Sequence, residues 1–485
     1  MQLPPHIASK LRPFQREPAS WLYTLLSSGT NCVDFSDCGV GKTYISMACA
    51  AALRLPTLVI APKISITAWE RVAAAFDEEI SCVGWESLRT GKTALGTWEF
   101  PRPKDATEQT RYYRCVNCQC SLGSYNLPPC FARHDKVHCF DTRSKPWNHG
   151  RFRFHDAVKF IIFDEIHRAA ARDSLNSDML IAARRQEKLI LGLSATPGNS
   201  PLQFKAIGYA LNLHNLTDFF HWARQHGCRR LPNLPGIHFA VGRDKQAGIM
   251  QRIHHAIIPS RGVRIRLEDI PNFPGIDIAT ELVDLDEPEK IDALYSEMAA
   301  ALSRLQVATS NDVDPNLPIT AQLRQRQMIE ILKVPALVEL THKYQDAGFS
   351  VVLFANFSAT ISELAKRLKT LAIIDGSVTG TQRDEVLFSF RDNQQAVLIV
   401  NSRAGGESCS LHDLDGNHPR VGLVSPGYDA RNFRQVLGRL RREGGKSIAR
   451  YRVVLAARTV EEHIKTALDG KLHNLDFLLD GDLLP

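Results

Sequence analysis

The sequence predicts an α/β protein with two parallel-sheet cores, because apolar strands alternate with helices in each half of the chain. Short apolar runs typical of buried strands occur at 31–35, 57–61, 158–163, 188–193, 350–355, 371–374 and 396–401. The clearest predicted helices cover 7–27, 42–53, 335–347 and 359–368. Strands that alternate with helices form parallel sheets that are covered on both faces. We therefore expect one α/β core in each half.

The chain around these two series divides into further parts. Residues 97–150 lose the strand and helix periods and are rich in Pro, Cys, Tyr, Arg and His, which indicates an insertion. Residues 241–332 are mostly helical in pattern. We expect a first core over 1–240 that contains the insertion, a helical linking region over 241–332, and a second core over 333–485.

The composition is that of an ordinary globular protein with a modest positive charge. Apolar residues make up 44% of the 485 residues and charged residues 23%. No run approaches the roughly 18 apolar residues of a membrane helix, and residues 1–6 lack the pattern of a secretory signal. We therefore expect no membrane partner and no secretion. The net charge of +7 favours nucleic acid over an acidic protein as the partner.

Eleven cysteines are present, and five of them fall between 115 and 139. Scattered single cysteines with one local cluster fit a reducing compartment and a single metal site better than a disulfide framework. We expect the cytoplasm of a bacterial or phage-infected cell, or the nucleus if the source is eukaryotic.

A glycine-bearing turn separates the strand at 31–35 from the helix at 42–53 and has the sequence Ser36-Asp37-Cys38-Gly39-Val40-Gly41-Lys42-Thr43. Gly39 and Gly41 would let backbone N–H groups close around phosphate oxygens at the positive end of the helix. Lys42 would reach the β- and γ-phosphates, and the hydroxyl of Thr43 would ligate Mg²⁺. Ser36 stands where the strict phosphate-loop pattern has glycine.

Two carboxylates end the strand at 158–163, in the segment Asp164-Glu165-Ile166-His167. The carboxyl edge of a parallel sheet is where ligands bind in open α/β folds. Asp164 would hold Mg²⁺ and Glu165 would orient and activate the attacking water.

Two further segments suit the same chemistry. Ser194-Ala195-Thr196-Pro197 follows the strand at 188–193, and the segment 435–442 begins at Gln435 and ends in arginines. Arginines three residues apart share one helical face, so Arg439 and Arg442 could both face a γ-phosphate.

These segments, in this order, resemble the motifs of the superfamily 2 helicases, and more closely those of the Swi/Snf-like branch of double-stranded DNA translocases. Residues 11–17 resemble the adenine-contacting segment, with Gln15 in the adenine-reading place, and Asp164 to His167 resemble a DEAH-type box. Residues 58–69, 354–357 and 403–408 are similar to motifs Ia, IV and V. The resemblance runs from about Leu11 to Ile464, outside the insertion.

The resemblance implies two RecA-like lobes joined by the helical linking region, with ATP bound between them. It implies that Ser194, Thr196 and Gln435 couple hydrolysis to DNA movement, and that Arg439 and Arg442 act as arginine fingers. Double-stranded or branched DNA is the implied partner, with RNA second. Swi/Snf members usually have Gly where Ala195 stands and His where Arg441 stands. The chain length suits a compact bacterial or phage-type member, in DNA repair or recombination.

The insertion carries a metal-knuckle spacing, Cys115-x2-Cys118. If a helix begins at Pro129, then Cys130, His134 and His138 share one face. Four Cys and His ligands suit a closed, tetrahedral Zn²⁺ site. We expect structural zinc on Cys115, Cys118, Cys130 and His134, with His138 or Cys139 as substitutes.

The leading hypothesis is an ATP-dependent DNA helicase or translocase that moves along or remodels DNA, by branch migration, fork remodelling or strand separation. The alternative is a zinc-module nucleic-acid-binding protein whose ATPase core is regulatory rather than a motor. A motor subunit of a restriction nuclease is a third reading, for which the sequence offers no nuclease carboxylate–lysine set.

Overall fold

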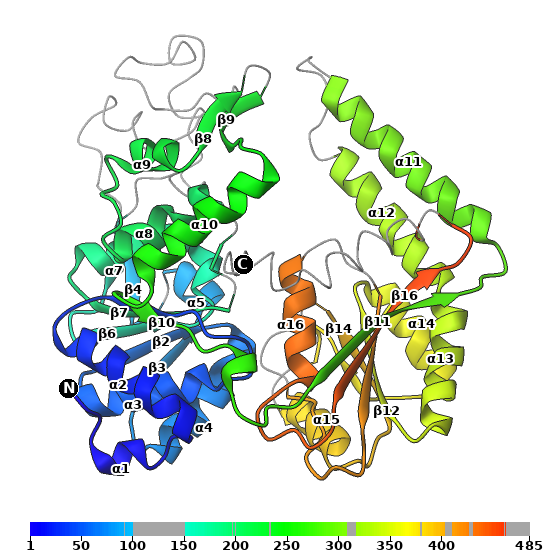
Figure 1. Ribbon diagram of the computed structural model, residues 1–485, viewed down its shortest axis with the longest axis horizontal. Helices are drawn as coiled ribbons and strands as arrows, with labels where there is room; N and C mark the ends of the chain where they lie inside the picture. The colour runs from blue at the N-terminus through cyan, green and yellow to red at the C-terminus, as the bar shows by residue number, and fades with distance from the viewer. Residues whose placement is uncertain are drawn as a thin grey trace, which may run out of the picture. The chain divides into compact units, whose positions relative to one another are not determined.

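The computed structural model of this chain describes most of its residues (Figure 1). The described residues are 1–91, 93–99, 151–195, 197–198, 200–231, 234–307, 317–378, 381–402, 410–425, 430–459 and 461. They form two compact units, one of residues 1–35 and 43–264, and the other of residues 36–42 and 265–485. The segment expected as a linking region, 241–332, is therefore shared between the two units.

The first unit is built on a six-stranded sheet in which every neighbouring pair is parallel. Its strand order is β10 (Gly262–Val263), β1 (Cys32–Asp34), β7 (Leu189–Leu193), β6 (Phe160–Phe163), β2 (Thr57–Ala61) and β3 (Ser81–Gly84). β2 and β6 are buried along their whole length, which is why they are apolar without alternation. The prediction of a parallel α/β core in this half is confirmed.

Helices connect the strands of the first unit. They are α1 (Pro5–Ala8), α2 (Pro13–Ser27), α3 (Lys42–Leu53), α4 (Ile66–Ala75), α5 (Trp85–Arg89), α7 (Leu175–Arg185), α8 (Lys205–Ala210), α9 (Phe219–Gln225) and α10 (Arg243–Ile257), with short 3₁₀ turns at Lys63–Ser65, Ile166–Ala169 and Pro201–Phe204. The prediction of a single helix over 7–27 is wrong, because α1 ends at Ala8 and a new helix begins at Pro13. A residue that precedes proline is pushed out of the helical region, and Arg12 accordingly has ψ 152°.

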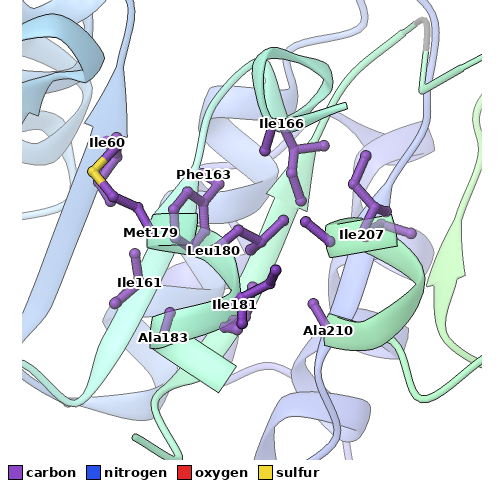
Figure 2. Close-up of a cluster of buried hydrophobic side chains, with 14 of the residues drawn as sticks. Ile60, Ile161, Phe163, Ile166, Met179, Leu180, Ile181, Ala183, Ile207 and Ala210 are labelled. Atoms are coloured by element: carbon purple, nitrogen blue, oxygen red, sulfur yellow. The ribbon is translucent and has the colours of Figure 1, made fainter. Parts of the chain in front are cut away.

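One apolar cluster of the first unit is formed by residues of α7 and α8 together with residues of β2 and β6. Figure 2 shows Phe163 and Ile161 of β6 in this cluster, with Met179 and Leu180 of α7 and Ile207 of α8. Phe163 is fully buried and directly precedes Asp164. The cluster therefore fixes the end of β6, from which the two candidate carboxylates leave the sheet.

Two antiparallel ribbons stand outside this sheet. β4 (Gly96–Glu99) pairs with β5 (Arg151–Phe154), and β8 (Cys228–Leu231) pairs with β9 (Leu234–Phe239). Residues 97–99 of the predicted insertion belong to β4, and its residues 100–150 lie outside the described part of the chain. Among the described residues, no helix has the length and apolar character that crossing a membrane requires.

The second unit contains another six-stranded sheet that is parallel throughout. Its order is β11 (Ile276–Val283), β16 (Ala449–Ala456), β15 (Arg420–Val424), β12 (Ser350–Ala355), β14 (Val397–Asn401) and β13 (Ile373–Ile374). The helices are α11 (Pro288–Val307), α12 (Leu317–Leu332), α13 (Val334–Asp346), α14 (Ser358–Leu368), α15 (Thr381–Arg391) and α16 (Ala430–Leu440), with a 3₁₀ turn at Leu267–Asp269. The predicted second α/β core is confirmed.

Candidate functional site

Three candidate segments leave the first sheet at the same edge. The glycine-bearing turn follows β1, Ser194 follows β7, and Asp164 follows β6, and these three strands are adjacent and parallel. The N–H of Ser194 donates to the carbonyl oxygen of Asp34 at 3.1 Å, which ties the ends of β7 and β1 together. Ligands bind outside the carboxyl ends of strands in such sheets. This edge is therefore the candidate site.

The glycine-bearing turn has the backbone of a phosphate loop. Gly39 and Gly41 have φ of 90° and 85°, in the left-handed region that side chains rarely adopt, and α3 begins directly at Lys42. A Cβ atom added to Gly39 would lie 3.2 Å from the carbonyl oxygen of Arg441, so space as well as φ requires glycine there. The Lys42 ammonium donates to the carbonyl oxygens of Ser36 and Asp37, both at 2.9 Å. Lys42 thus lies folded over the turn that it is expected to serve.

The start of this turn is bonded to the segment after β10. The N–H of Ile265 donates to the hydroxyl of Ser36 at 2.8 Å, and the N–H of Leu267 donates to Asp37 Oδ2 at 3.1 Å. The N–H of Asp37 donates to the carbonyl oxygen of Ile265 at 3.0 Å. Ser36 is fully buried, so its hydroxyl satisfies a backbone group that glycine would leave unpaired. This bond is a physical reason for the departure from the strict loop pattern.

Two buried tryptophans hold Asp164. The indole nitrogen of Trp69 donates to Asp164 Oδ2 at 3.0 Å, and that of Trp85 donates to the carbonyl oxygen of Asp164 at 2.8 Å. Trp69 is 1% exposed and Trp85 is fully buried. Sequence reasoning missed both residues, because a tryptophan in an apolar segment has no distinguishing pattern. The nearest indication was the motif Ia resemblance, which ends at Trp69.

Glu165 adopts an uncommon backbone conformation at the end of β6, with φ 53° and ψ 52°. Its Oε2 lies 3.1 Å from Nδ1 of His167, and the same nitrogen lies 3.0 Å from the hydroxyl oxygen of Ser194. The imidazole therefore connects the carboxylate expected to orient water with the serine expected to couple hydrolysis to movement. His167 is the part of this link that the sequence did not single out.

The other residues predicted to act in the first unit are Gln15, Thr43 and Thr196. Gln15 is 5% exposed, and its Oε1 accepts the N–H of Arg12 at 3.0 Å in a capping box at the start of α2. Thr43 lies in the first turn of α3 and is half-buried. Thr196 lies outside the described residues.

The candidate arginines of the second unit lie around the end of α16. Arg439 is 5% exposed and belongs to the helix, which ends at Leu440, so Arg442 lies beyond it. This differs from the expectation that one helix carries both. Arg442 donates from Nε to the carbonyl oxygen of Gly438 at 3.0 Å and from Nη1 to the hydroxyl of Ser410 at 2.9 Å. Gln435, also on α16, is half-buried.

The structure describes the predicted magnesium ligands but not the predicted zinc ligands. Thr43 and Asp164 offer a hydroxyl and a carboxylate, the hard oxygen donors that Mg²⁺ prefers, so the residues present fit that ion. Among the described residues, no group of three or more His, Cys, Asp or Glu side chains is arranged to hold a metal. The zinc candidates Cys115, Cys118, Cys130, His134, His138 and Cys139 all lie outside the described part.

Two family profiles match the chain in sequence. Residues 10–199 match the family described as "Type III restriction enzyme, res subunit", and residues 332–444 match the "Helicase conserved C-terminal domain". The first match contains the glycine-bearing turn and the candidate carboxylates, and the second contains the candidate arginines. Each profile therefore spans one half of the predicted machinery.

Proteins that match nearly the whole chain are also named as helicases. The "Putative ATP-dependent RNA helicase L364" of Acanthamoeba polyphaga mimivirus is 29% identical over 98% of this chain and 85% of its own length. The "Probable ATP-dependent DNA helicase CHR23" of Arabidopsis thaliana is 21% identical over 96% of this chain, which spans only 43% of that protein. A solved Sulfolobus solfataricus SWI2/SNF2 ATPase core in complex with dsDNA covers 97% of this chain and 93% of its own, at 15% identity and a TM-score of 0.35.

Proposed function

We propose that this chain, which belongs to the superfamily 2 helicases and to their Swi/Snf-like branch, uses ATP to move along or remodel double-stranded or branched DNA. As a member of this family it is an ATP-hydrolysing enzyme with a nucleic-acid partner. The observation that carries the motor proposal is the contact of His167 with both Glu165 and Ser194, because it links the hydrolytic carboxylate to the segment after β7.

The hydrolytic roles follow from the chemistry of the residues. Backbone N–H groups around Gly39 and Gly41 bind phosphate oxygens, and Lys42 exchanges its carbonyl partners for the β- and γ-phosphates. Thr43 and Asp164 would hold Mg²⁺, and the bound ion would supply positive charge to the phosphate oxygens. Glu165 orients the attacking water, and Arg439 and Arg442 stabilise the charge that develops on the transferring phosphate. Gln15 recognises the adenine.

Coupling uses the segment that follows β7. Ser194 is fully buried and bonded to the end of β1 through its N–H, so it cannot move without disturbing the sheet edge. A shift of Ser194 changes the hydrogen bonding of His167, and His167 in turn contacts Glu165. Thr196 and Gln435 belong to the same coupling set. In this way the nucleic-acid path and the water-orienting carboxylate can influence each other.

DNA is the proposed track because the resemblance is to duplex DNA translocases and the net charge is +7. The mimivirus relative carries the name of an RNA helicase, so the substrate panel must include RNA. ATPase rates should be compared with single-stranded, duplex, forked and four-way DNA and with duplex RNA, using E165Q as the inactive control. We expect duplex or branched DNA to stimulate most. Stimulation by RNA alone would overturn the DNA assignment.

Contacts along the track should be made mainly to phosphates, because a motor must cross every base sequence. Binding affinity should then fall steeply between 50 and 200 mM salt, by roughly 10³-fold if six or more phosphates are contacted, and vary little with sequence. Tight binding to one short sequence that survives high salt would contradict translocation. Strand-displacement and triplex-displacement assays on the same protein distinguish strand separation from movement along intact duplex.

The insertion is proposed to bind one structural Zn²⁺ through Cys115, Cys118, Cys130 and His134, with His138 or Cys139 as substitutes. The support is ligand type and spacing in the sequence. Metal analysis of the purified chain should give one zinc per molecule, and C115S combined with C118S should lose it while basal ATPase survives. If this variant instead loses all nucleic-acid binding and ATP turnover proves independent of DNA, the alternative of a zinc-module binding protein with a regulatory ATPase is favoured.

A further inference from the structure

We propose that Trp69 and Trp85 are positioning residues of the hydrolytic site, Trp69 for the carboxylate of Asp164 and Trp85 for the backbone of Glu165. The proposal rests on the proposed roles of Asp164 as a magnesium ligand and Glu165 as the carboxylate that orients water. The two tryptophans come from different helices, α4 and α5, yet both indole nitrogens end on Asp164.

Packing alone does not account for this arrangement. Trp69 and Trp85 are among the largest fully buried side chains of the chain, and a buried indole N–H needs an acceptor. Side-chain donors bond mostly to backbone groups or water, as the half-buried Trp98 does with the carbonyl oxygen of Arg89 at 2.8 Å. Trp69 instead donates to the carboxylate that is expected to ligate the metal. A phenylalanine would fill most of the same space without directing that carboxylate.

Trp69 fixes one oxygen of the Asp164 carboxylate. Its hydrogen bond to Oδ2 restricts rotation of the carboxylate group, so the two oxygens keep defined places. Mg²⁺ demands near-ideal octahedral geometry, and partners that orient a metal ligand typically change metal affinity or activity by about 10–100-fold. The loss of Trp69 should therefore appear first as weaker Mg²⁺ binding, so that nucleotide binding needs a higher Mg²⁺ concentration.

Trp85 acts on the next peptide. The carbonyl of Asp164 belongs to the peptide group that precedes Glu165, so the orientation of that group determines φ of Glu165. Trp85 holds this carbonyl at 2.8 Å, and its ring packs against Phe163 with centroids 5.5 Å apart. Glu165 keeps a left-handed conformation that non-glycine residues rarely adopt without support from the surrounding structure. Release of the carbonyl should let Glu165 relax away from His167.

The experiment compares W69F and W85F with W98F, a matched loss of a tryptophan in the same unit that is bonded elsewhere. Binding of ADP is measured against Mg²⁺ concentration, and turnover against ATP at saturating Mg²⁺. W69F should raise the Mg²⁺ concentration for half-maximal effect by at least about tenfold with magnesium-free ADP affinity unchanged. W85F should leave magnesium dependence unchanged and lower kcat, and adding E165Q to W85F should cost much less than E165Q alone. W98F should match the parent protein.

A spectroscopic measurement avoids reliance on turnover. The chain has six tryptophans, so protein labelled with ¹⁵N-tryptophan gives six indole N–H signals. The three phenylalanine variants assign the signals of Trp69, Trp85 and Trp98. Addition of Mg²⁺ and ADP should shift the Trp69 signal, and D164N should shift both the Trp69 and Trp85 signals but not that of Trp98. Replacement of either tryptophan by 3-benzothienylalanine, which keeps the ring shape and lacks the N–H, serves if a phenylalanine variant does not fold.

The possible results distinguish a failure of the tryptophan roles from a failure of the assignment of Asp164 as the metal ligand. If D164N alters magnesium dependence while W69F does not, and the Trp69 signal ignores Mg²⁺ and ADP, the positioning role of Trp69 is wrong. If W85F and E165Q have independent effects on kcat, the role of Trp85 is wrong. If D164N itself leaves magnesium dependence unchanged, the assignment of the metal ligand on which the proposal rests is wrong.

Discussion

The Nδ1 atom of His167 lies 3.0 Å from the hydroxyl oxygen of Ser194, a contact between the segments that follow two neighbouring strands, β6 and β7. The same nitrogen lies 3.1 Å from Glu165 Oε2. Both oxygens meet the same ring nitrogen, so a change in the hydrogen bond between Ser194 and His167 also changes the contact between His167 and Glu165. The relation gives a physical route between hydrolysis and the segment expected to respond to nucleic acid.

S194A should uncouple nucleic acid from hydrolysis. Without the hydroxyl, His167 keeps its contact with Glu165, so we expect basal ATPase to remain within a few-fold of the parent while stimulation by DNA falls by about tenfold or more. Steady-state ATPase with and without duplex DNA measures both. S200A is the control, because the Ser200 hydroxyl accepts the N–H of Leu202 at a nearby turn. Equal losses of basal and stimulated rates would contradict the coupling role.

E165Q and K42A should affect different steps. E165Q removes the water-orienting carboxylate and keeps Asp164, so ATP binding should persist while kcat falls by about 10²–10⁴-fold. K42A removes the cation that is expected to contact the transferring phosphate and should abolish hydrolysis. Fluorescent-nucleotide binding together with steady-state kinetics distinguishes the two effects. Near-normal turnover of either variant would refute the site.

R442A and R439A should mainly lower kcat, by up to roughly 10³–10⁵-fold for an arginine that stabilises transition-state charge. R441A is the matched control, because Arg441 donates to the carbonyl oxygen of Pro274 at 3.0 Å and lies over the ring of Phe273. We expect R441A to retain most of its turnover. If R439A and R442A weaken DNA binding with kcat preserved, these arginines belong to the DNA path.

His412 is a buried histidine that makes the stability of the second unit depend on pH. It is 7% exposed, and burial together with the nearby charges of Arg442, Arg391 and Arg420 lowers its pKa from 6.5 to about 4. In the unfolded chain the imidazole takes up a proton below pH 6.5, whereas in the folded chain it does so only near pH 4. The unfolded state therefore binds more protons in this interval, and the free energy of unfolding falls as the pH drops through it.

H412Q should flatten that dependence. The contribution of this group between pH 6.5 and 4 is at most about 3 kcal/mol, since one pKa unit corresponds to about 1.4 kcal/mol. Urea unfolding of the parent and H412Q at several pH values measures the difference between their free energies of unfolding. We expect the difference to change steadily as the pH falls and to level off near pH 4. A constant difference over this range would contradict the shifted pKa.

The sequence predicted the buried parts of the fold well and the charged edge poorly. The bounds of α3, β2 and β12 agree with the predicted ranges, because strands buried on both faces are uninterrupted apolar runs. β3, β10, β11, β15 and β16 were missed. β15 is an exception to the division between buried and charged parts, because it is buried along its whole length. β11 is an edge strand, and β11 and β16 carry Asp277 and Arg452, whose side chains pair at 2.9 Å. Their polarity hides the strand pattern until the pairing partner is known.

In the candidate site, residues that form local sequence patterns were predicted, and residues that act through distant contacts were not. The glycine spacing and the two carboxylates are local patterns, and phosphate and metal chemistry requires those residue types at those places. The bond from Trp69 to Asp164 joins residues 95 positions apart, and Trp69 has the appearance of an ordinary core residue of α4. No local pattern marks an indole that directs a carboxylate. Such partners emerge only when the strand order brings the helices to the sheet edge.

The β4–β5 ribbon makes the insertion exchangeable. Glu99 is paired with Arg151, so the described chain before residue 100 and after residue 150 lies side by side in one ribbon. A two-residue hairpin turn could close the ribbon in their place, and longer replacements would cost little additional closure entropy. Evolution or protein engineering could therefore replace the whole insertion at this ribbon. The strand order of the first sheet, at whose edge the candidate nucleotide site lies, would stay the same.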